Sequence, residues 1–253
     1  MADAYDSLGR GYGAGRRPDP RIADAIWAAL GDARTVLNVG AGTGNYEPPD
    51  RDVVAVEPSA VMRAQRPAGS APCVTAYAEA LPFADDSFDA VLTVLSDHHW
   101  RDNAGGLREC ARVGRRVVLF NWENARTETF WLVRDYVPEF AAVAGAHRSL
   151  AERAAECLAP DARVAPLPIP WDCEDAFFHA FWRRPAAYLR PQVRAATSVW
   201  ARLGRDVEER AVAALEADLA SGAWAARNAG IMDLDACDVG ARLVVAETAG
   251  GQA

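Results

Sequence analysis

Three glycines lie at every second position in the segment VLNVGAGTGNYE, residues 36–47. They are Gly40, Gly42 and Gly44, and they follow an apolar run that ends at the polar residue Asn38. Glycine permits positive φ angles and lets a ligand approach the main chain closely. The N–H groups of the turn that follows can then bind a polar group of that ligand. On their own, the glycines also fit an ordinary tight turn between a strand and a helix.

An acidic residue makes the pattern more specific. Glu57 ends a second apolar run, DVVAVE at 52–57. A carboxylate at the tip of such a strand accepts hydrogen bonds from the two hydroxyls of a ribose. The glycine turn and the acid together predict a ligand that contains a nucleoside. The spacing GxGxG, with Asn45 in place of the third glycine of GxGxxG, does not favour a pyrophosphate.

The composition excludes several kinds of chemistry. The chain has no lysine, so all 27 basic residues are arginine, and an amine nucleophile, a Schiff base or a P-loop lysine is ruled out. The net charge of −8 argues against a nucleic-acid partner. The five cysteines are scattered without metal-ligand spacing, so we expect no metal site. No apolar run approaches the roughly 18 residues of a membrane span and no signal-peptide core is present, so we expect a cytoplasmic protein without a membrane partner.

The elements that must position these residues alternate between strand and helix. Apolar runs predict strands at 35–40, 52–57, 73–78, 87–96, 115–122 and 242–247. Helical spacing recurs at 18–30, 59–66, 103–113, 125–145, 149–159 and through most of 174–220. The segment 163–172 is strand-like, but its three prolines restrict it to a sheet edge or an irregular stretch. This alternation predicts an α/β fold, a mostly parallel sheet with helices on both faces.

Four motifs occur in one order along the chain: VLNVGAGTG, VAVEPS, AEALPFADDSFDAVLTVLSDHHW and RRVVLFNW. Together they resemble the class I S-adenosylmethionine-dependent methyltransferases, in particular the type 11 small-molecule branch, over residues 5–145. The resemblance implies a Rossmann-like sheet of seven strands with a helical insert between the last two. We expect a cofactor-binding core, residues 1–172 with 238–253, and a helical substrate-cap insert at 173–237. The implied cofactor is S-adenosyl-L-methionine.

The resemblance also implies which residues bind this cofactor. They are Tyr12, Arg16, Arg17, Asn38, Gly40, Ala41, Gly42, Gly44, Glu57, Pro58, Ser59, Met62, Ala78, Glu79, Leu95 and Ser96. The glycine turn would lie under the methionine and ribose parts, and Glu57 would bind the ribose hydroxyls. An arginine of the N-terminal element could pair with the methionine carboxylate.

Two residues depart from the family pattern. The family usually has an acid where this chain has Asn38, and an Asp where it has Tyr77. An amide can still hydrogen-bond the turn, and an aromatic contact can replace a carboxylate near the adenine. We expect both changes to weaken polar recognition of the cofactor without abolishing the site.

The segment SDHHW, residues 96–100, holds the candidates for catalysis. If the methyl acceptor is a hydroxyl or an acidic carbon, a base must take its proton, and histidine suits this role because its pKa is near neutral. His98 and His99 are both candidates, and neighbouring residues on an extended stretch point in opposite directions, so at most one should face the substrate. The sequence does not rank them. One histidine could instead pack under the sheet while the other caps the next helix.

The acceptor pocket is expected to come from aromatic residues of the cap and its insert. They are Trp122, Trp131, Tyr136, Phe177, Phe178, Phe181, Trp182, Tyr188 and Trp200. Such residues suit a planar or apolar small molecule, although for most of them a role in the core of the insert is the favoured alternative. We expect a monomer or homodimer. The alternatives are a cofactor-binding protein without methyl transfer and, disfavoured by GxGxG and the lack of Tyr-x-x-x-Lys, a nicotinamide-dependent oxidoreductase.

Overall fold

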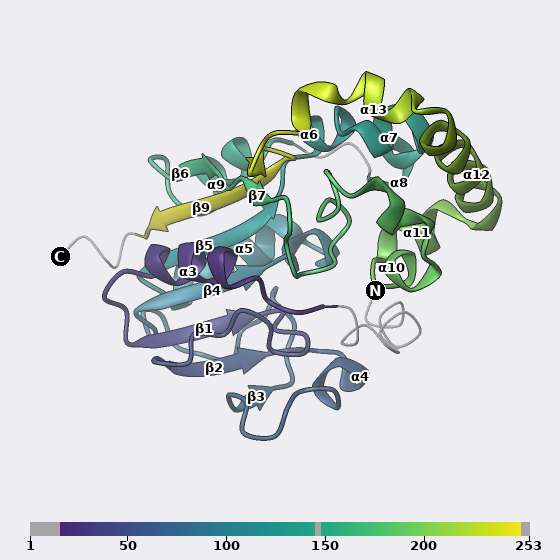
Figure 1. The fold of residues 1–253 in the computed structure, drawn as a ribbon. Coiled ribbons are helices and arrows are strands. Elements are labelled where there is room, and N and C mark those ends of the chain that lie inside the picture. Colours follow the sequence, from purple (N-terminus) through teal and green to yellow (C-terminus); the bar gives the residue numbers. More distant parts are fainter. Residues whose placement is uncertain (1–15, 145–147, 249–253) are drawn as a thin grey trace.

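A sheet of seven strands forms the centre of the computed structural model, which describes residues 16–144 and 148–248 (Figure 1). The strand order is β3-β2-β1-β4-β5-β9-β6. The strands are β1 (Thr35–Val39), β2 (Asp52–Val56), β3 (Cys73–Val74), β4 (Ala90–Val94), β5 (Arg116–Trp122), β6 (Arg163–Pro166) and β9 (Ala241–Glu247). Tyr12 lies outside the described residues.

The first five strands of this sheet are parallel. Only β9 reverses direction, so it is antiparallel to both β5 and β6. The predicted fold class, a Rossmann-like, mostly parallel sheet of seven strands, is therefore confirmed. Of the predicted segment 163–172, β6 is an edge strand that ends at Pro166, and Pro170 lies in a separate two-stranded ribbon, as expected because a proline cannot donate to a second neighbouring strand.

Helices cover both faces of the sheet. They are α3 (Pro20–Ala29), α4 (Ala60–Arg63), α5 (Asn103–Val113) and α9 (Leu150–Cys157). The alternating side chains of β1 show how the faces are filled, since Val36 packs in one cluster with Ile26 of α3 and Leu37 packs in another with Val113 of α5. Strands buried on both faces read as continuous apolar runs, which is why these strands could be found in the sequence.

A predicted strand and a predicted helix of the first part of the chain differ from the structure. The expected strand 73–78 keeps only two residues in β3, because residues 76–78 turn away to line a pocket. The expected helix 125–145 consists of three short helices, α6 (Asn124–Glu128), α7 (Trp131–Tyr136) and α8 (Phe140–Ala144). Pro138 separates the last two, since it lacks an N–H and disfavours helical backbone at Val137.

The insert follows β6 and returns to the sheet at β9. A two-stranded ribbon of β7 (Ile169–Pro170) and β8 (Ala236–Cys237) joins its ends. Its helices are η2 (Pro185–Leu189), α10 (Pro191–Ala195), α11 (Ser198–Leu203), α12 (Arg205–Ser221), α13 (Ala223–Arg227) and η3 (Ala229–Ile231). They gather on the side toward which β1 and β2 point (Figure 1). The domain division at 173–237 stays a prediction.

The start of the insert is irregular, although helix was expected from residue 174 onward. Residues 171–184 form turns, in which Phe177, Phe178, Phe181 and Trp182 are all buried. A single helix at the surface would present a polar face to solvent. Here the core surrounds the segment, so these four aromatic side chains are all buried. Tertiary packing therefore overrides the local helical preference. No helix among the described residues is both long and apolar enough to span a bilayer.

Trp182 offers a test of this packing. It is fully buried, and its Nε1 donates to the main-chain oxygen of Ile169 at 3.0 Å. We expect Trp182→Ala to lower the free energy of unfolding by about 3–5 kcal/mol, measured by chemical denaturation, because it leaves a large cavity. Trp171→Ala is the control, since Trp171 is 39% exposed and should cost less than about 1 kcal/mol. Equal losses from the two variants would contradict this packing.

Candidate cofactor site

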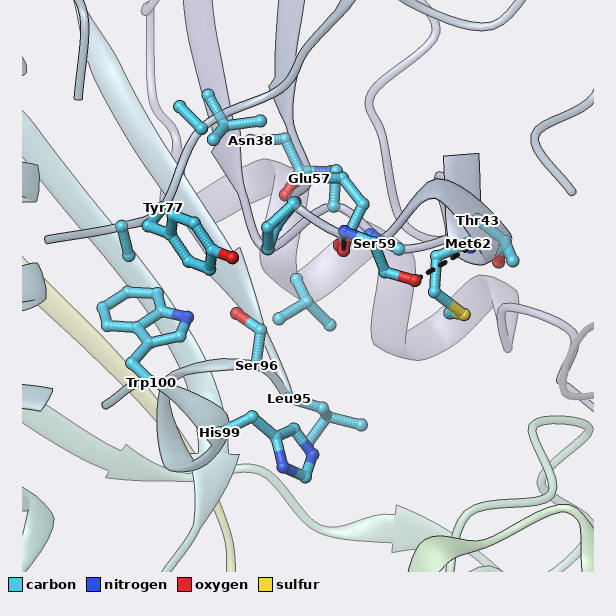
Figure 2. A pocket seen from close by; sticks show the side chains of 18 of the residues that line it. Asn38, Thr43, Glu57, Ser59, Met62, Tyr77, Leu95, Ser96, His99 and Trp100 are labelled. Carbon is cyan, nitrogen blue, oxygen red and sulfur yellow. Dashed lines mark hydrogen bonds between the residues drawn. The ribbon is translucent and has the colours of Figure 1, made fainter. Parts of the chain in front are cut away.

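A pocket lies at the carboxyl ends of β1, β2 and β4 (Figure 2). It encloses about 1010 Å³, part of which is open to solvent. The predicted residues that line it are Arg16, Asn38, Gly40, Ala41, Gly42, Glu57, Pro58, Ser59, Met62, Ala78, Glu79, Leu95, Ser96 and His99. Thr43, Asn45, Tyr46, Val56, Ala76, Tyr77, Val94, Trp100 and Arg101 complete the lining.

Three predicted residues lie outside this lining. Arg17 is exposed on the chain that leads to α3. Gly44 faces the Arg66 guanidinium, which would lie 3.2 Å from a Cβ added there. His98 is also exposed. The structure therefore brings most of the predicted residues together, and of the two histidines it places His99 alone in the pocket lining.

The glycine turn needs glycine for two reasons, its positive φ angles and the close packing of a neighbouring loop. Gly40, Gly42 and Gly44 all have positive φ, at 70°, 53° and 92°. A Cβ on Gly40 would lie 2.6 Å from Cβ and Oγ of Ser96, so the chain after β4 packs directly on this glycine. Ser96 in turn donates from Oγ to the main-chain oxygen of Val39 at 3.0 Å. The missing side chain at Gly40 therefore makes room for a neighbouring loop.

Glu57 holds two loops of the pocket together. One carboxylate oxygen accepts from the N–H of Gly42 at 2.8 Å, and the other accepts from the N–H of Ser59 at 2.8 Å. The side chain is buried, which raises the pKa of its carboxyl group, while the two N–H donors oppose that rise. Each carboxylate oxygen has capacity for a further hydrogen bond. The residues present thus fit a ligand that offers two neighbouring hydroxyls.

Asn38 has a specific reason to be an amide. Its Nδ2 donates to a carboxylate oxygen of Glu47 at 3.1 Å, and Glu47 pairs with Arg66 at 2.9 Å. Asn38 itself is 1% exposed. An acid at position 38 would place two carboxylates side by side with little water. In the family pattern an acidic residue stands at position 38. In this chain the negative charge belongs instead to Glu47, which is not among the residues that line the pocket.

The N-terminal segment and the insert meet the glycine turn in a buried network. Arg16 pairs with both carboxylate oxygens of Asp175, with its Nη2 at 3.0 Å from one of them. Tyr46 donates its hydroxyl to the same carboxylate at 2.9 Å, and burial strongly raises the pKa of that hydroxyl. Tyr46 also has φ of 64°, uncommon for a bulky residue. Asp175 thus links residues that line the pocket to the insert.

The end of β4 turns sharply into the SDHHW segment. Leu95 has φ of 51°, and its N–H donates to the main-chain oxygen of Phe120 at 2.8 Å. Strained backbone of this kind persists where the surrounding structure fixes it and is common at functional sites. The turn leads into the short helix η1 (Asp97–His99). Leu95 and His99 lie at one end of the pocket, with Asn38 and Glu57 at the other (Figure 2).

The two histidines have different surroundings. His99 lines the pocket, and burial, together with the nearby His98, lowers its pKa well below the ordinary value. Its imidazole is therefore neutral at pH 7, and a neutral ring nitrogen can accept a hydrogen bond from a hydroxyl. The rings of His98 and His99 lie 3.8 Å apart, and Nδ1 of His98 is 3.2 Å from the amide nitrogen of Asn121.

Asp97 is a structural anchor of this segment. It is fully buried and accepts from Arg153 at 2.7 Å, from Asn103 at 3.0 Å, and from Asn121. These contacts tie η1 to β5, α5 and α9. Because its oxygens are engaged by these donors, Asp97 fixes the shape of the turn.

Trp100 and Arg101 belong to the pocket but were not predicted. A Cβ on Gly106 would lie 2.4 Å from the Trp100 ring, so that glycine leaves room for the indole. The Arg101 guanidinium stands 5.2 Å from the centre of the Tyr77 ring. Glu79 accepts from the main-chain N–H of Arg101 at 2.7 Å and so fixes this turn. The paired glycines of NAGGL were the one sequence signal for a bulky neighbour.

The aromatic residues of the predicted acceptor pocket do not line this cavity. All nine belong to or pack against one hydrophobic cluster. Trp131 illustrates this, since its ring contacts those of Tyr136, Tyr188 and Trp224 at centroid distances of 5.2–6.0 Å. The alternative, that these residues form the core of the insert, describes the structure better. No group of His, Cys, Asp and Glu in the described ranges could hold a metal ion.

Comparisons with known proteins show the family to which the chain belongs. A family model described as a methyltransferase domain matches residues 37–119. A solved Anabaena variabilis protein, assigned as a methyltransferase of an antibiotic biosynthesis pathway, is 32% identical with a TM-score of 0.84, covering 92% of this chain and 98% of its own. The ubiquinone/menaquinone biosynthesis C-methyltransferase UbiE of Geobacter sulfurreducens is 32% identical over 156 residues, 51% of this chain and 58% of the relative. An uncharacterized Escherichia coli protein, YafE, is 49% identical over 47 residues, 17% of this chain and 23% of the relative.

These matches define the class of the protein. The chain spans less than two thirds of the curated relatives' lengths but almost the whole of the solved structure. The chain belongs to the class I S-adenosylmethionine-dependent methyltransferases, in the type 11 family. Its cofactor is S-adenosylmethionine, and the buried carboxylate of Glu57 above the glycine turn fits the sugar of that cofactor.

Glu57 provides a quantitative test of the site. We expect Glu57→Ala to weaken binding of S-adenosylhomocysteine by about 1–3 kcal/mol in isothermal titration, because hydroxyl partners are left unpaired. Asp89→Ala is a matched control, since Asp89 also accepts from two main-chain N–H groups, those of Arg34 and Thr35, but at the opposite end of the sheet. Unchanged affinity in Glu57→Ala would mean that the sugar binds elsewhere.

Asn38 and Glu47 provide a test of the relocated charge. In Asn38→Asp two carboxylates would face each other, so one would have a raised pKa in the folded state. The variant should therefore lose stability relative to the wild type as pH rises from 4 to 7, by about 1–3 kcal/mol in denaturant titrations at pH 7. Adding Glu47→Gln to this variant should restore the lost stability. A loss of stability that does not depend on pH and that Glu47→Gln does not reverse would contradict the contact between residues 38 and 47.

Proposed function

We propose that this protein transfers the methyl group of S-adenosylmethionine to a small-molecule acceptor and that His99 is the base of the reaction. The observation that carries the proposal is the position of His99. It lines the same pocket as Glu57 and the glycine turn but lies at the opposite end, beside Leu95 (Figure 2). A base there could reach an acceptor that lies beyond the cofactor.

The sulfonium of the bound cofactor supplies a strongly activated methyl group. The chain would therefore contribute mainly position and exclusion of water. Glu57 and the glycine turn would fix the nucleoside, and the strained turn at Leu95 would bring the end of β4 against the reacting region. His99, neutral at pH 7, would take the proton of an acceptor hydroxyl or acidic carbon on a ring nitrogen.

The neighbours of His99 support this division of roles. His98 stands outside the pocket, and Asn121 holds its Nδ1 at 3.2 Å. Asn121 is itself fixed by Asp97, which is buried among donors. His98 is thus placed to orient His99 through ring contact, and Asp97 to hold the turn in shape.

The proposed acceptor is a small apolar or aromatic natural product, which suits the apolar side chains of Val94, Leu95 and Trp100 in the pocket lining. We also propose that the enzyme is cytoplasmic and acts as a monomer or homodimer without a nucleic-acid partner. The net charge of −8 supports the last point, because phosphate binding favours a basic surface.

Two measurements test the function. Isothermal titration with S-adenosylhomocysteine and with NAD should show binding of the first alone, and binding of NAD alone would reject the proposal. Transfer of labelled methyl from S-adenosylmethionine to small-molecule fractions of a cell extract should then yield a labelled product. Cofactor binding without any labelled product across a broad panel would favour a binding protein that has lost methyl transfer.

The histidine pair gives a sharper prediction. His99→Ala should lower turnover by about 10²–10⁴-fold while leaving the affinity for S-adenosylhomocysteine nearly intact. His98→Ala is the matched control and should cost much less. Because the pKa of His99 is lowered, its base form is complete at neutral pH, so wild-type turnover should be flat from pH 6.5 to 8 if no other group titrates. Full turnover in both variants would show that the acceptor needs no base.

A further inference from the structure

A buried amide connects the end of β5 to the segment SDHHW. Asn121 is 3% exposed, and its Oδ1 accepts from the main-chain N–H of Trp122 at 2.8 Å. Its Nδ2 donates to a carboxylate oxygen of Asp97 and lies 3.2 Å from Nδ1 of His98. One end of the amide therefore faces an N–H donor and the other end faces an acceptor oxygen.

These partners fix the orientation of the amide. With its oxygen and nitrogen exchanged, two N–H donors would face each other at Trp122 and two acceptor oxygens at Asp97. Asp97 also accepts from Arg153 of α9 at 2.7 Å and from Asn103 of α5 at 3.0 Å, so its oxygens are held in place. The amide nitrogen therefore faces His98, and because it can only donate, Nδ1 of His98 is the acceptor. A neutral His98 ring then carries its proton on Nε2.

The same contact disfavours a positive charge on His98. A second proton would have to enter the ring at Nδ1, where it would face the N–H group of Asn121. His99 is the ring that such a charge would affect, since the centres of the two imidazoles are 3.8 Å apart. A positive charge at that distance opposes the uptake of a proton by His99.

Charged groups also approach the two histidines from other elements. Burial is the largest cause of the lowered pKa of His99; Arg202 of α11 lowers it further, and Asp97 on the same short helix opposes the change. Arg153 of α9 pairs with Asp97 at 2.7 Å and offsets its negative charge. The group in contact with Nδ1 of His98 is the uncharged amide, which acts through its donor alone.

We propose that Asn121 is a positioning residue of the methyl transfer, which fixes the tautomer of His98, keeps that ring uncharged and thereby leaves His99 able to take the proton of the acceptor. This inference rests on the proposed role of His99 as the base. His99 takes the proton while the acceptor atom bonds to the methyl carbon, whose bond to sulfur breaks with the electron pair going to sulfur. Asn121 is not among the residues that line the pocket, so it acts through His98 and not on the acceptor.

The test is made on the full-length protein saturated with S-adenosylhomocysteine. The ring nitrogens of His98 are observed by ¹⁵N NMR, with His98→Gln identifying their signals. In the wild type at pH 7, Nδ1 should give the signal of an unprotonated nitrogen and Nε2 that of a protonated one. Asn121→Leu keeps a similar volume without a donor, so both nitrogens should give the averaged signals of two exchanging tautomers.

Methyl transfer provides a second readout. Turnover is measured with labelled S-adenosylmethionine and the extract fraction that yields a labelled product. An ordinary imidazole is about three-quarters charged at pH 6, so turnover of Asn121→Leu should fall about fourfold from pH 8 to pH 6, while that of the wild type stays nearly constant. The affinity for S-adenosylhomocysteine should be the same in both proteins.

Asn103→Leu is the matched control, since the side chain of Asn103 also donates to Asp97 but pairs with Arg153 instead of His98. It should leave the His98 signals as in the wild type. A protonated Nδ1 in the wild type, which is decisive even if a variant does not fold, or equal His98 signals in wild type and Asn121→Leu would overturn the inference. Full turnover in His99→Ala would instead reject the proposed base and leave the NMR comparison unaffected, so the two failures are distinguishable.

Discussion

The buried carboxylate of Glu57 is the contact on which the rest of the site depends. Its two oxygens accept from the N–H groups of Gly42 and Ser59, so the turn after β1 and the turn after β2 are held at one separation. The first turn can reach Glu57 only because its glycines have positive φ. Ser96 then fills the space above Gly40 and sets where the chain leaves β4. A single carboxylate thereby fixes the floor of the pocket and, through the packing of Ser96, the place where His99 enters it.

The insert is tied to this floor by a second buried carboxylate. Asp175 binds both Arg16 and Tyr46, and the latter two line the pocket. Removal of a partner from such a group would leave a charge buried without compensation. The irregular segment 171–184 is therefore anchored to the pocket at Asp175, and further along Tyr188 donates its hydroxyl to the main-chain oxygen of Phe178 at 2.6 Å.

Local sequence patterns predicted the fold and much of the site, because these patterns reflect contacts between residues that are close in the chain. The apolar runs predicted the strands, and the glycine turn together with Glu57 predicted the position of the pocket. The rest depends on contacts between distant segments. Asp175 lies 129 residues from Tyr46, and nothing in either segment pairs them. The choice between His98 and His99 required the path of η1, and the role of Asn38 required Glu47, whose charge replaces the acid of the family pattern. The aromatic residues of the insert were open to two interpretations, since a core and a ligand pocket have the same composition.

The central claim is that the sugar of the cofactor binds the carboxylate of Glu57 above the glycine turn, with its reactive end toward His99. A crystal structure with S-adenosylhomocysteine tests it most directly. The account predicts both ribose hydroxyls within about 3 Å of the Glu57 carboxylate oxygens and the sulfur on the Leu95 side of the pocket. A ribose that faces away from Glu57, or a nucleoside bound outside the pocket, would contradict it.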